Sequence, residues 1–222
     1  MRPDKLLRWI FLLLMFTTAL FLYAQDADDE DEDEDEGGIN IETDWSRIMN
    51  VYNNGDQLFC INLGIVKPLF FVEQNEGYFE TQMNLGGGGS LSYMYFLDSH
   101  WFLGAELGGM FCSTIGKNMY YIIPVGFRGG YQFIAKRFEF PLSLMIGFAP
   151  QSHAERTYFG LFSKSSAGAF FRINTDWSFG INTSFWWVPQ WTSKKRELDY
   201  RTRSINIHGF FWELTAGVRY HF

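Results

Sequence analysis

Asp98, Ser99 and His100 are the residue types of a hydrolytic triad, and they follow one another directly in the sequence. In such a triad a base accepts the proton of the serine hydroxyl while a carboxylate orients the base, so three side chains must converge. Consecutive residues in a tight turn cannot be aligned in this way. We therefore assign no catalytic residue to this chain and expect that it is not an enzyme.

Two further patterns could bind a ligand. His153 and His208 lie far apart and lack the spacing of a metal site. The glycine run 86–89 resembles a phosphate-binding loop, but neither a helix pattern nor a supporting lysine accompanies it. A strand that must curve explains the run better. The sequence thus predicts neither a bound metal nor a cofactor.

Six charged residues lie on the less apolar face of alternating segments, three acids and three bases. They are Glu106, Glu139, Glu213, Arg128, Arg172 and Arg219. Folding the chain about a loop near Lys117 would put Glu106 opposite Arg128. Because buried charges must be paired, we expect two ion clusters. The middle cluster is predicted to hold Glu106, Arg128 and Glu213, and the lower cluster Glu139, Arg172 and Arg219.

The elements that carry these residues are eight segments in which apolar and polar residues alternate with a period of two, as in β-strands. They cover residues 58–67, 82–97, 101–112, 120–134, 138–148, 161–174, 178–188 and 205–222. The apolar faces of eight strands are too many to be buried in one hydrophobic core. We therefore expect these faces to contact lipid. In lipid, strands satisfy their backbone only as a closed barrel.

The connections between these segments alternate in length. Three are short, whereas those at 68–81, 113–119, 149–160 and 189–204 are longer. Short turns at one end and longer loops at the other are typical of bacterial outer-membrane barrels. An even number of strands would leave both chain ends on the periplasmic side.

The N-terminus has the pattern of an export signal. Arg2, Lys5 and Arg8 precede an apolar run from Trp9 to Ala24. A membrane-spanning helix is the alternative, but 16 residues are fewer than the roughly 20 that span a bilayer, and acidic residues follow them. We predict a signal peptide at 1–24, cleaved after Ala24.

The formal net charge of −7 arises from one short segment. Residues 26–36 hold ten of the 25 acidic residues, and Asp4 lies in the predicted signal. The 186 residues from Gly37 onward contain 14 acidic and 15 basic residues, so their net charge is close to zero. A chain of this length is typical of one domain. We expect a solvated acidic tail and a short periplasmic segment at 25–56, with cation binding by the tail as the alternative, and a transmembrane barrel at 57–222.

These features, together with the terminal Tyr220, His221 and Phe222, resemble the small eight-stranded bacterial outer-membrane β-barrels. That family includes the transmembrane domain of outer membrane protein A and outer membrane proteins X and W. The resemblance covers about residues 57–222 and implies an all-β, antiparallel, up-and-down transmembrane barrel in the bacterial outer membrane. It also implies that the last strand, with Val218, Tyr220 and Phe222, is the signature that the outer-membrane assembly machinery reads.

An eight-stranded barrel has an interior that side chains can fill. The inward charges could form a gate or a proton-linked pathway, or they could serve as a polar core. The filled interior favours the core, so we expect no wide aqueous pore. Cys60 and Cys112 should stay unpaired, because the predicted topology puts them on the order of 20 Å apart and a disulfide needs about 4.4–6.8 Å between Cα atoms.

The predicted outer loop at 189–204 is basic. It contains Lys194, Lys195, Arg196, Arg201 and Arg203, with Trp191 among them. Against Glu197 and Asp199 this leaves a net charge of +3. Clustered bases bind sulfated or phosphorylated polyanions, so this loop is the candidate contact surface. The alternative is a solvated loop beside anionic lipid headgroups.

The sequence therefore predicts a non-enzymatic outer-membrane protein that supports membrane integrity and makes surface contacts or adheres through its outer loops. A narrow porin-like channel for small or hydrophobic solutes is the alternative, and a lipid-modifying outer-membrane enzyme is a third possibility. The expected partners are outer-membrane lipid, the outer-membrane assembly machinery and host glycans or other polyanions. A nucleic-acid partner is not expected.

Overall fold

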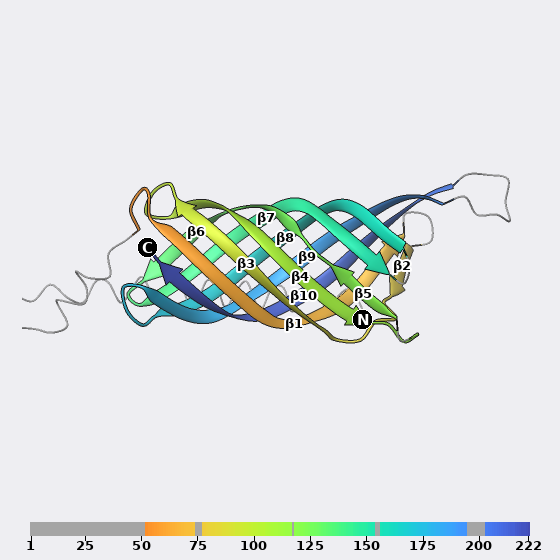
Figure 1. Cartoon of the computed structure of the whole chain (residues 1–222), viewed down its shortest axis with the longest axis horizontal. Helices are drawn as coiled ribbons and strands as arrows, with labels where there is room; N and C mark the ends of the chain where they lie inside the picture. The colour runs from red at the N-terminus through yellow and green to blue at the C-terminus, as the bar shows by residue number, and fades with distance from the viewer. Residues whose placement is uncertain (1–51, 74–76, 117, 154–155, 195–202) are drawn as a thin grey trace, which may run out of the picture. The chain divides into compact units, whose positions relative to one another are not determined.

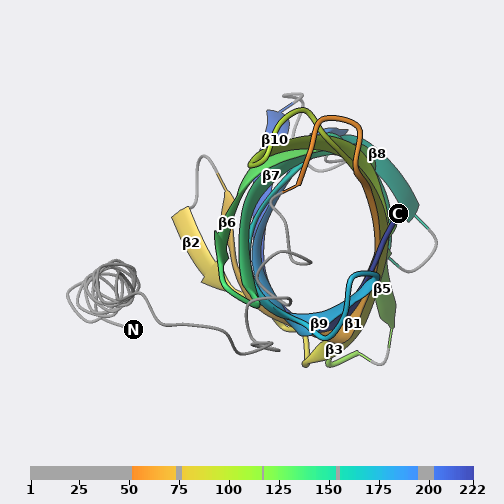
Figure 2. The same ribbon diagram turned by 90° about the vertical axis from the view of Figure 1, so that its left-hand side faces the viewer.

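The structure is a computed structural model that describes residues 52–73, 77–116, 118–153, 156–194 and 203–222. Within them, ten strands form one sheet that closes into a barrel, seen from the side in Figure 1 and end-on in Figure 2. The strands are β1 (Gln57–Glu73), β2 (Gly77–Glu80), β3 (Gly86–Phe96), β4 (Trp101–Ser113), β5 (Met119–Ile122), β6 (Val125–Ala135), β7 (Phe138–His153), β8 (Arg156–Arg172), β9 (Trp177–Lys194) and β10 (Arg203–His221). The predicted signal peptide and the acidic run at 26–36 lie outside the described residues.

The ten strands fill eight positions around the barrel. β10 pairs antiparallel with β1 and closes the sheet, with Val218 opposite Ile61. β5 and β6 both pair with β4 and β7 and share one position, interrupted at Pro124, which has no N–H to give to the ladder. β2 pairs with the same edge of β1 as β3 does and extends that position. The predicted eight-stranded antiparallel barrel is confirmed.

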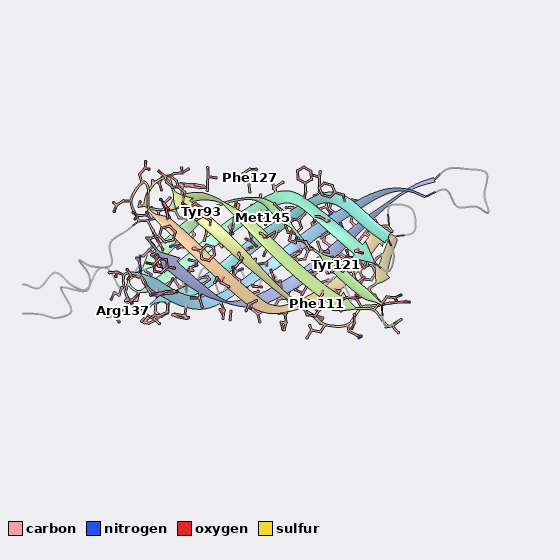
Figure 3. All side chains as sticks on the ribbon, viewed as in Figure 1. Tyr93, Phe111, Tyr121, Phe127, Arg137 and Met145 are labelled. Carbon is pink, nitrogen blue, oxygen red and sulfur yellow. The ribbon has the colours of Figure 1, made fainter. Side chains whose placement is uncertain are left out.

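The outer wall of the barrel is largely apolar, whereas the charged side chains of the ion clusters point inward. Leu103 and Phe127 are 55% and 82% exposed, whereas Glu106 and Arg128 are each 3% exposed. Phe127 projects from the outer wall in Figure 3. A protein that folds in water buries its large apolar side chains, so this surface suits a lipid environment. Within the part of the chain that the structure describes, no helix has the length and apolarity needed to cross a bilayer.

The two ends of the barrel differ. Turns at 97–100, 136–137 and 173–176 join strands at what we call the short-turn end, and the predicted short connections are confirmed. Phe222 also lies at this end, where its backbone exchanges two hydrogen bonds with Gln57 at 3.0 and 3.1 Å. At the opposite, hairpin end, β9 and β10 project beyond their neighbours (Figure 1).

The predicted loops at the hairpin end are wrong in extent, because much of 149–160 and 189–204 is paired strand. His153 faces Arg156, and Lys194 faces Arg203. Outside the apolar band both faces of a hairpin meet water, so the alternation that marks a strand in the sequence fades.

The predicted loop at 68–81 is also largely strand, in β1 and β2. The register of β1 shifts between Pro68 and Phe70, and Phe71 is consequently buried inside the barrel. A bulge of this kind reverses which residues face inward. The two-residue pattern therefore appeared to end at Lys67.

Two groups of buried apolar side chains occupy the interior at different heights. The hairpin cluster contains Val66, Phe71, Met110, Cys112, Tyr120, Ile122, Met145, Ala149, Phe162, Trp186, Val188 and Phe211. The short-turn cluster contains Tyr52, Leu58, Cys60, Met94, Phe96 and Phe102. Along β4, Glu106 stands between Phe102 of one cluster and Met110 of the other. Charged side chains such as Glu106 therefore lie in the middle of the interior, between the two apolar clusters.

Candidate functional site

The middle ion cluster joins four charged side chains from four strands. Arg128 Nη1 lies 2.8 Å from Glu106 Oε2, and Lys164 Nζ lies 2.7 Å from Glu106 Oε1 and 2.9 Å from Glu213 Oε2. The structure thus brings together the three residues predicted for this cluster, through a fourth, Lys164. All four are buried, and their two carboxylates balance two cations.

The predicted placement of Arg128 directly opposite Glu106 is wrong by two residues. Arg128 pairs with Gly104, and Glu106 pairs with Gly126. The ion pair is therefore diagonal across the β4–β6 ladder, a separation that a long arginine side chain spans. The Arg128 Nε also donates to Ser143 Oγ at 2.9 Å, which fixes the guanidinium in this orientation.

Lys164 was not recognised from the sequence. Its Nζ lies 5.0 Å from the ring centroid of Trp186, whose Nε1 donates to Glu213 Oε2 at 3.0 Å. Lys164 has the same parity along β8 as the inward Phe170 and Arg172, so the period of two contained the signal. The predicted segment 161–174 includes Lys164, but the predicted ion clusters contain only arginines as cations.

The lower ion cluster contains the three residues predicted for it. Arg219 Nη1 lies 3.3 Å from Glu139 Oε2, and Arg172 Nε lies 3.7 Å from Glu139 Oε1. Arg219 also reaches Gln132 Oε1 at 3.3 Å and places its Cζ 3.5 Å from the ring centroid of Phe170. Two guanidinium groups face one carboxylate, so this cluster carries an excess of positive charge.

Tyr52 completes the lower cluster from outside the strands, and no sequence pattern singled it out. Its hydroxyl donates to Glu139 Oε1 at 3.0 Å and lies 3.0 Å from His221 Nδ1. Its ring stacks on Phe96 with centroids 3.7 Å apart and an interplanar angle of 3°. Burial, and then the nearby Glu139 carboxylate, raise the pKa of Tyr52 well above its usual value, so the phenol keeps its proton.

Aromatic side chains of the hairpin cluster close the interior on the other side of the middle ions. Phe162 meets Trp186 edge to face at 5.0 Å, and Tyr120 stacks on Phe211 at 6.1 Å. Trp186 also contacts the middle ions through Glu213. The interior thus consists of paired charges held between two layers of apolar side chains.

The residues of the assembly signature form the closing seam of the barrel. Val218 and Tyr220 face outward and pair with Ile61 and Phe59 of β1. The ring of Phe222 lies 5.5 Å from Tyr220, within an aromatic belt at the short-turn end. Removal of Phe222 would therefore shorten this seam.

The predicted basic loop is only partly within the described residues. Lys194 and Arg203 are paired ends of β9 and β10, whereas Lys195, Arg196 and Arg201 lie outside the described residues. The assignment of Trp191 to a loop is wrong, because its backbone pairs with that of Asn206 within the β9–β10 ladder. Lys194 and Arg203 are thus the last described pair of the β9–β10 ladder.

The triad-like residues form a turn. The Asp98 Oδ1 accepts backbone N–H bonds from His100 and Trp101, both at 2.7 Å, while Ser99 Oγ lies 2.7 Å from His100 Nδ1. The carboxylate thus caps the turn through these two backbone bonds. Among the described residues, no group of three His, Cys, Asp or Glu side chains could hold a metal ion.

Cys60 and Cys112 are both free and buried, so the prediction that they are unpaired is confirmed. Cys60 belongs to the short-turn cluster and Cys112 to the hairpin cluster. The two thiols therefore mark opposite ends of the interior.

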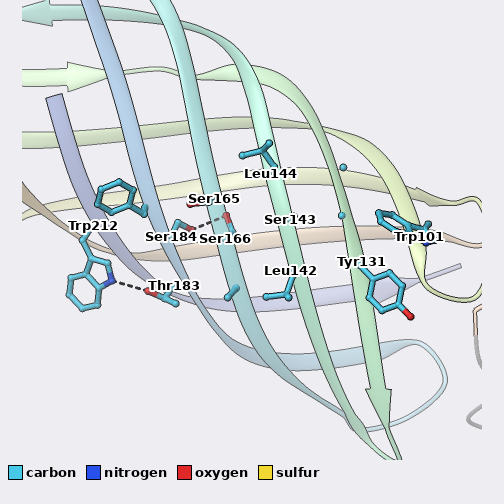
Figure 4. Close-up of a pocket in the computed structure, with 14 residues that line it drawn as sticks. Trp101, Tyr131, Leu142, Ser143, Leu144, Ser165, Ser166, Thr183, Ser184 and Trp212 are labelled. Atoms are coloured by element: carbon cyan, nitrogen blue, oxygen red, sulfur yellow. Dashed lines mark hydrogen bonds between the residues drawn. The ribbon is translucent and has the colours of Figure 1, made fainter. Parts of the chain in front are cut away.

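The outer wall carries a groove of about 650 Å³ over β6 to β9 (Figure 4). Large side chains such as Tyr131 and Leu144 flank small ones such as Ser165 and Ala167. The β8–β9 ladder is continuous beneath it, with Ser165 opposite Phe185. The groove is thus a hollow in the outer surface of the barrel wall.

Comparison with solved structures gives barrels of the same kind. Neisserial surface protein A superposes with a TM-score of 0.52 at 11% identity, over 76% of this chain and 97% of that protein. The outer membrane protein OprG from Pseudomonas aeruginosa gives a TM-score of 0.52 at 12% identity, over 77% and 97%. Identities this low show the fold alone. The resemblance to small eight-stranded outer-membrane barrels is confirmed.

Sequence comparison gives relatives without a described activity. An uncharacterized protein of Treponema pallidum (strain Nichols) is 31% identical over 139 residues, which cover 62% of this chain and 60% of the relative. The chain thus spans about 60% of the length of that relative. A family model matches residues 33–220, well over half of the chain. This chain therefore belongs to the family of that model, and its own fold is a closed eight-stranded barrel like those of the solved outer-membrane proteins.

Proposed function

We propose that this outer-membrane β-barrel protein is a closed scaffold that anchors a contact surface, rather than a pore or an enzyme. The observation that carries the proposal is the interior, where Glu106, Arg128, Lys164 and Glu213 balance one another between two apolar layers. Paired charges in a filled, narrow interior leave little room for a water column. We assign them the role of a polar core.

The contact surface is proposed to be the basic segment that joins β9 to β10 in the sequence. The β9–β10 hairpin projects furthest at its end of the barrel (Figure 1) and carries the basic segment around Lys194, Lys195 and Arg196. Its partner would be a sulfated or phosphorylated polyanion, such as a host glycan or a surface lipid. Residues 1–24 are proposed to direct export to the bacterial outer membrane, where lipid and the assembly machinery are the remaining partners.

A binding measurement with immobilised heparin tests this surface. Replacing Lys194, Lys195 and Arg196 together with Gln should abolish retention, and salt should weaken binding by the intact protein, because the screening length falls from about 10 Å at 0.1 M to about 3 Å at 1 M. A matched control replaces Lys136 and Arg137 at the short-turn end. Retention that survives both the triple substitution and high salt would exclude the hairpin as the adhesive surface.

A further inference from the structure

Tyr52 belongs to the segment that precedes β1, yet its ring is buried among side chains of the barrel interior. We propose that Tyr52 is a removable stopper of the interior at the short-turn end, and that its withdrawal opens a vestibule selective for small anions. Tyr52 and the turn at 53–56 would thereby control access to the lower ion cluster. This inference goes beyond the scaffold role, because it gives the closed interior an entrance.

The contacts that fix the ring are made by side chains. Two hydrogen bonds connect the hydroxyl with Glu139 and His221, one face stacks on Phe96, and the Arg172 Cζ lies 5.3 Å from the ring centroid. None of these contacts continues a strand ladder. The ring can therefore leave its position without breaking the backbone pairing of the barrel.

A turn next to Tyr52 provides a fixed point about which the ring could move. Gly55 N donates to Phe96 O at 3.0 Å, and Asn53 N donates to Asp56 Oδ2 at 2.8 Å. Gly55 has a φ of +104°, a conformation that side-chain-bearing residues rarely adopt. The turn is tied to the end of β3, and Tyr52 directly precedes it.

The charge behind the stopper determines which solutes would enter. Arg172 and Arg219 outnumber Glu139, and Arg219 Nε has no hydrogen-bond partner among the described residues although the side chain is 1% exposed. An unpaired buried donor on a cation is satisfied best by an anion or by water. The middle cluster is balanced and provides no such preference.

The two native thiols allow a direct test, because Cys60 lies in the same apolar cluster as Tyr52 and Cys112 lies in the other. The full chain is refolded in micelles with only one cysteine, after Cys112→Ala or Cys60→Ala. Each form is treated with an anionic methanethiosulfonate carrying a sulfonate and with a cationic one carrying a trimethylammonium group. Intact mass gives the rate of modification, and heat-modifiable gel mobility verifies folding.

Cys60 should be protected in the native chain and should react about tenfold faster or more after Tyr52→Ala, as expected when local opening controls access. The anionic reagent should be the faster one. Tyr52→Phe, which keeps the stacking on Phe96, should produce a smaller rise. If Tyr52→Ala does not fold, Gly55→Val gives the second test, since it strains the turn and should displace the ring with the same effect on Cys60.

Three results would overturn the proposal. Unchanged protection of Cys60 in Tyr52→Ala and Gly55→Val would show that the ring does not close the entrance. An equal rise at Cys112 would indicate general loosening of the barrel. Faster reaction of the cationic reagent would contradict the selectivity for anions. None of these measurements depends on the contact surface at the hairpin end, so the two proposals can fail separately.

Discussion

Lys164 Nζ lies 2.7 Å from Glu106 Oε1, although 58 positions separate the two residues in the sequence. Their strands, β8 and β4, are not neighbours, because β7 and the shared β5 and β6 position lie between them. The ion pair therefore crosses the interior and connects β4 with β8, which share no backbone hydrogen bonds. The interior charges thus help to set the cross-section of the barrel.

We expect Lys164→Met to destabilise the barrel by about 3–5 kcal/mol, the usual cost of leaving a buried charge without its partner. Within the described residues, Lys164 is the cation that pairs with Glu213. Urea unfolding of the refolded protein, followed by tryptophan fluorescence, measures the change. Adding Glu213→Gln should recover part of the loss, since Glu106 then keeps Arg128. A double variant no more stable than Lys164→Met would contradict the assignment.

Arg128→Met should cost less than Lys164→Met. After loss of Arg128, Glu106 and Glu213 still share Lys164, whereas loss of Lys164 leaves Glu213 without its ion pair. The same unfolding measurement gives the order of the two variants. The reverse order would mean that Arg128, and not Lys164, is the centre of the cluster.

Deleting Phe222 should reduce insertion more than it reduces stability. The deletion removes two backbone hydrogen bonds to Gln57, worth about 0.5–1.5 kcal/mol each, and shortens the aromatic belt. Membrane fractionation in cells and heat-modifiable mobility of refolded protein separate the two effects. Phe222→Tyr keeps the bonds and the ring and serves as the control. Normal insertion of the deleted chain would remove Phe222 from the signature.

The turn at 97–100 should be sensitive to acid. Hydrogen bonds from the backbone N–H groups of Trp101 and then His100 lower the pKa of Asp98 below its usual value. An acid whose pKa is lowered on folding contributes stability in full above its unfolded pKa and loses it as the pH falls through the lowered value. Hydrogen exchange at the Trp101 amide should accelerate in that acidic range. The acceleration should vanish in Asp98→Ala, and an identical pH profile in this variant would exclude Asp98 as the cause.

Planar bilayers should show no large, steady channel for the intact protein, because paired ions and apolar side chains occupy the interior. Tyr52→Ala should also conduct little, since Phe162, Trp186 and their neighbours still close the hairpin end. A bilayer with a known porin controls for detection. Frequent large openings by the intact protein would favour the channel interpretation of the interior charges.

The eight strand positions of the barrel could be predicted from the sequence. A strand with lipid on one face and the interior on the other alternates strictly between apolar and less apolar residues. Leu103 and Glu106 differ in parity, and the structure puts them on opposite faces, 55% and 3% exposed. The same parity puts Lys164, which lies within the predicted segment 161–174, on the inner face together with Arg172. The alternation fades where both faces meet water, which is why the ends of β7 to β10 were assigned to loops.

The alternation of apolar and polar residues does not predict contacts that depend on strand register or on a reversal of the chain. The diagonal between Glu106 and Arg128 follows from a two-residue offset that the length of a loop does not specify. Tyr52 precedes the first alternating segment, and its return into the interior depends on the turn at Gly55. Neither feature leaves a repeating mark in the sequence.

The seam between β1 and β10 joins the first and last strands of the barrel. A contact between residues so distant in sequence closes late and costs more chain entropy than a hairpin does. Until it forms, both strands present unpaired edges, the kind of surface that recruits other chains into aggregates. A fragment that lacks either β1 or β10 cannot close the barrel and leaves a strand edge unpaired. The chain can therefore avoid aggregation through these edges only after both strands have been synthesised.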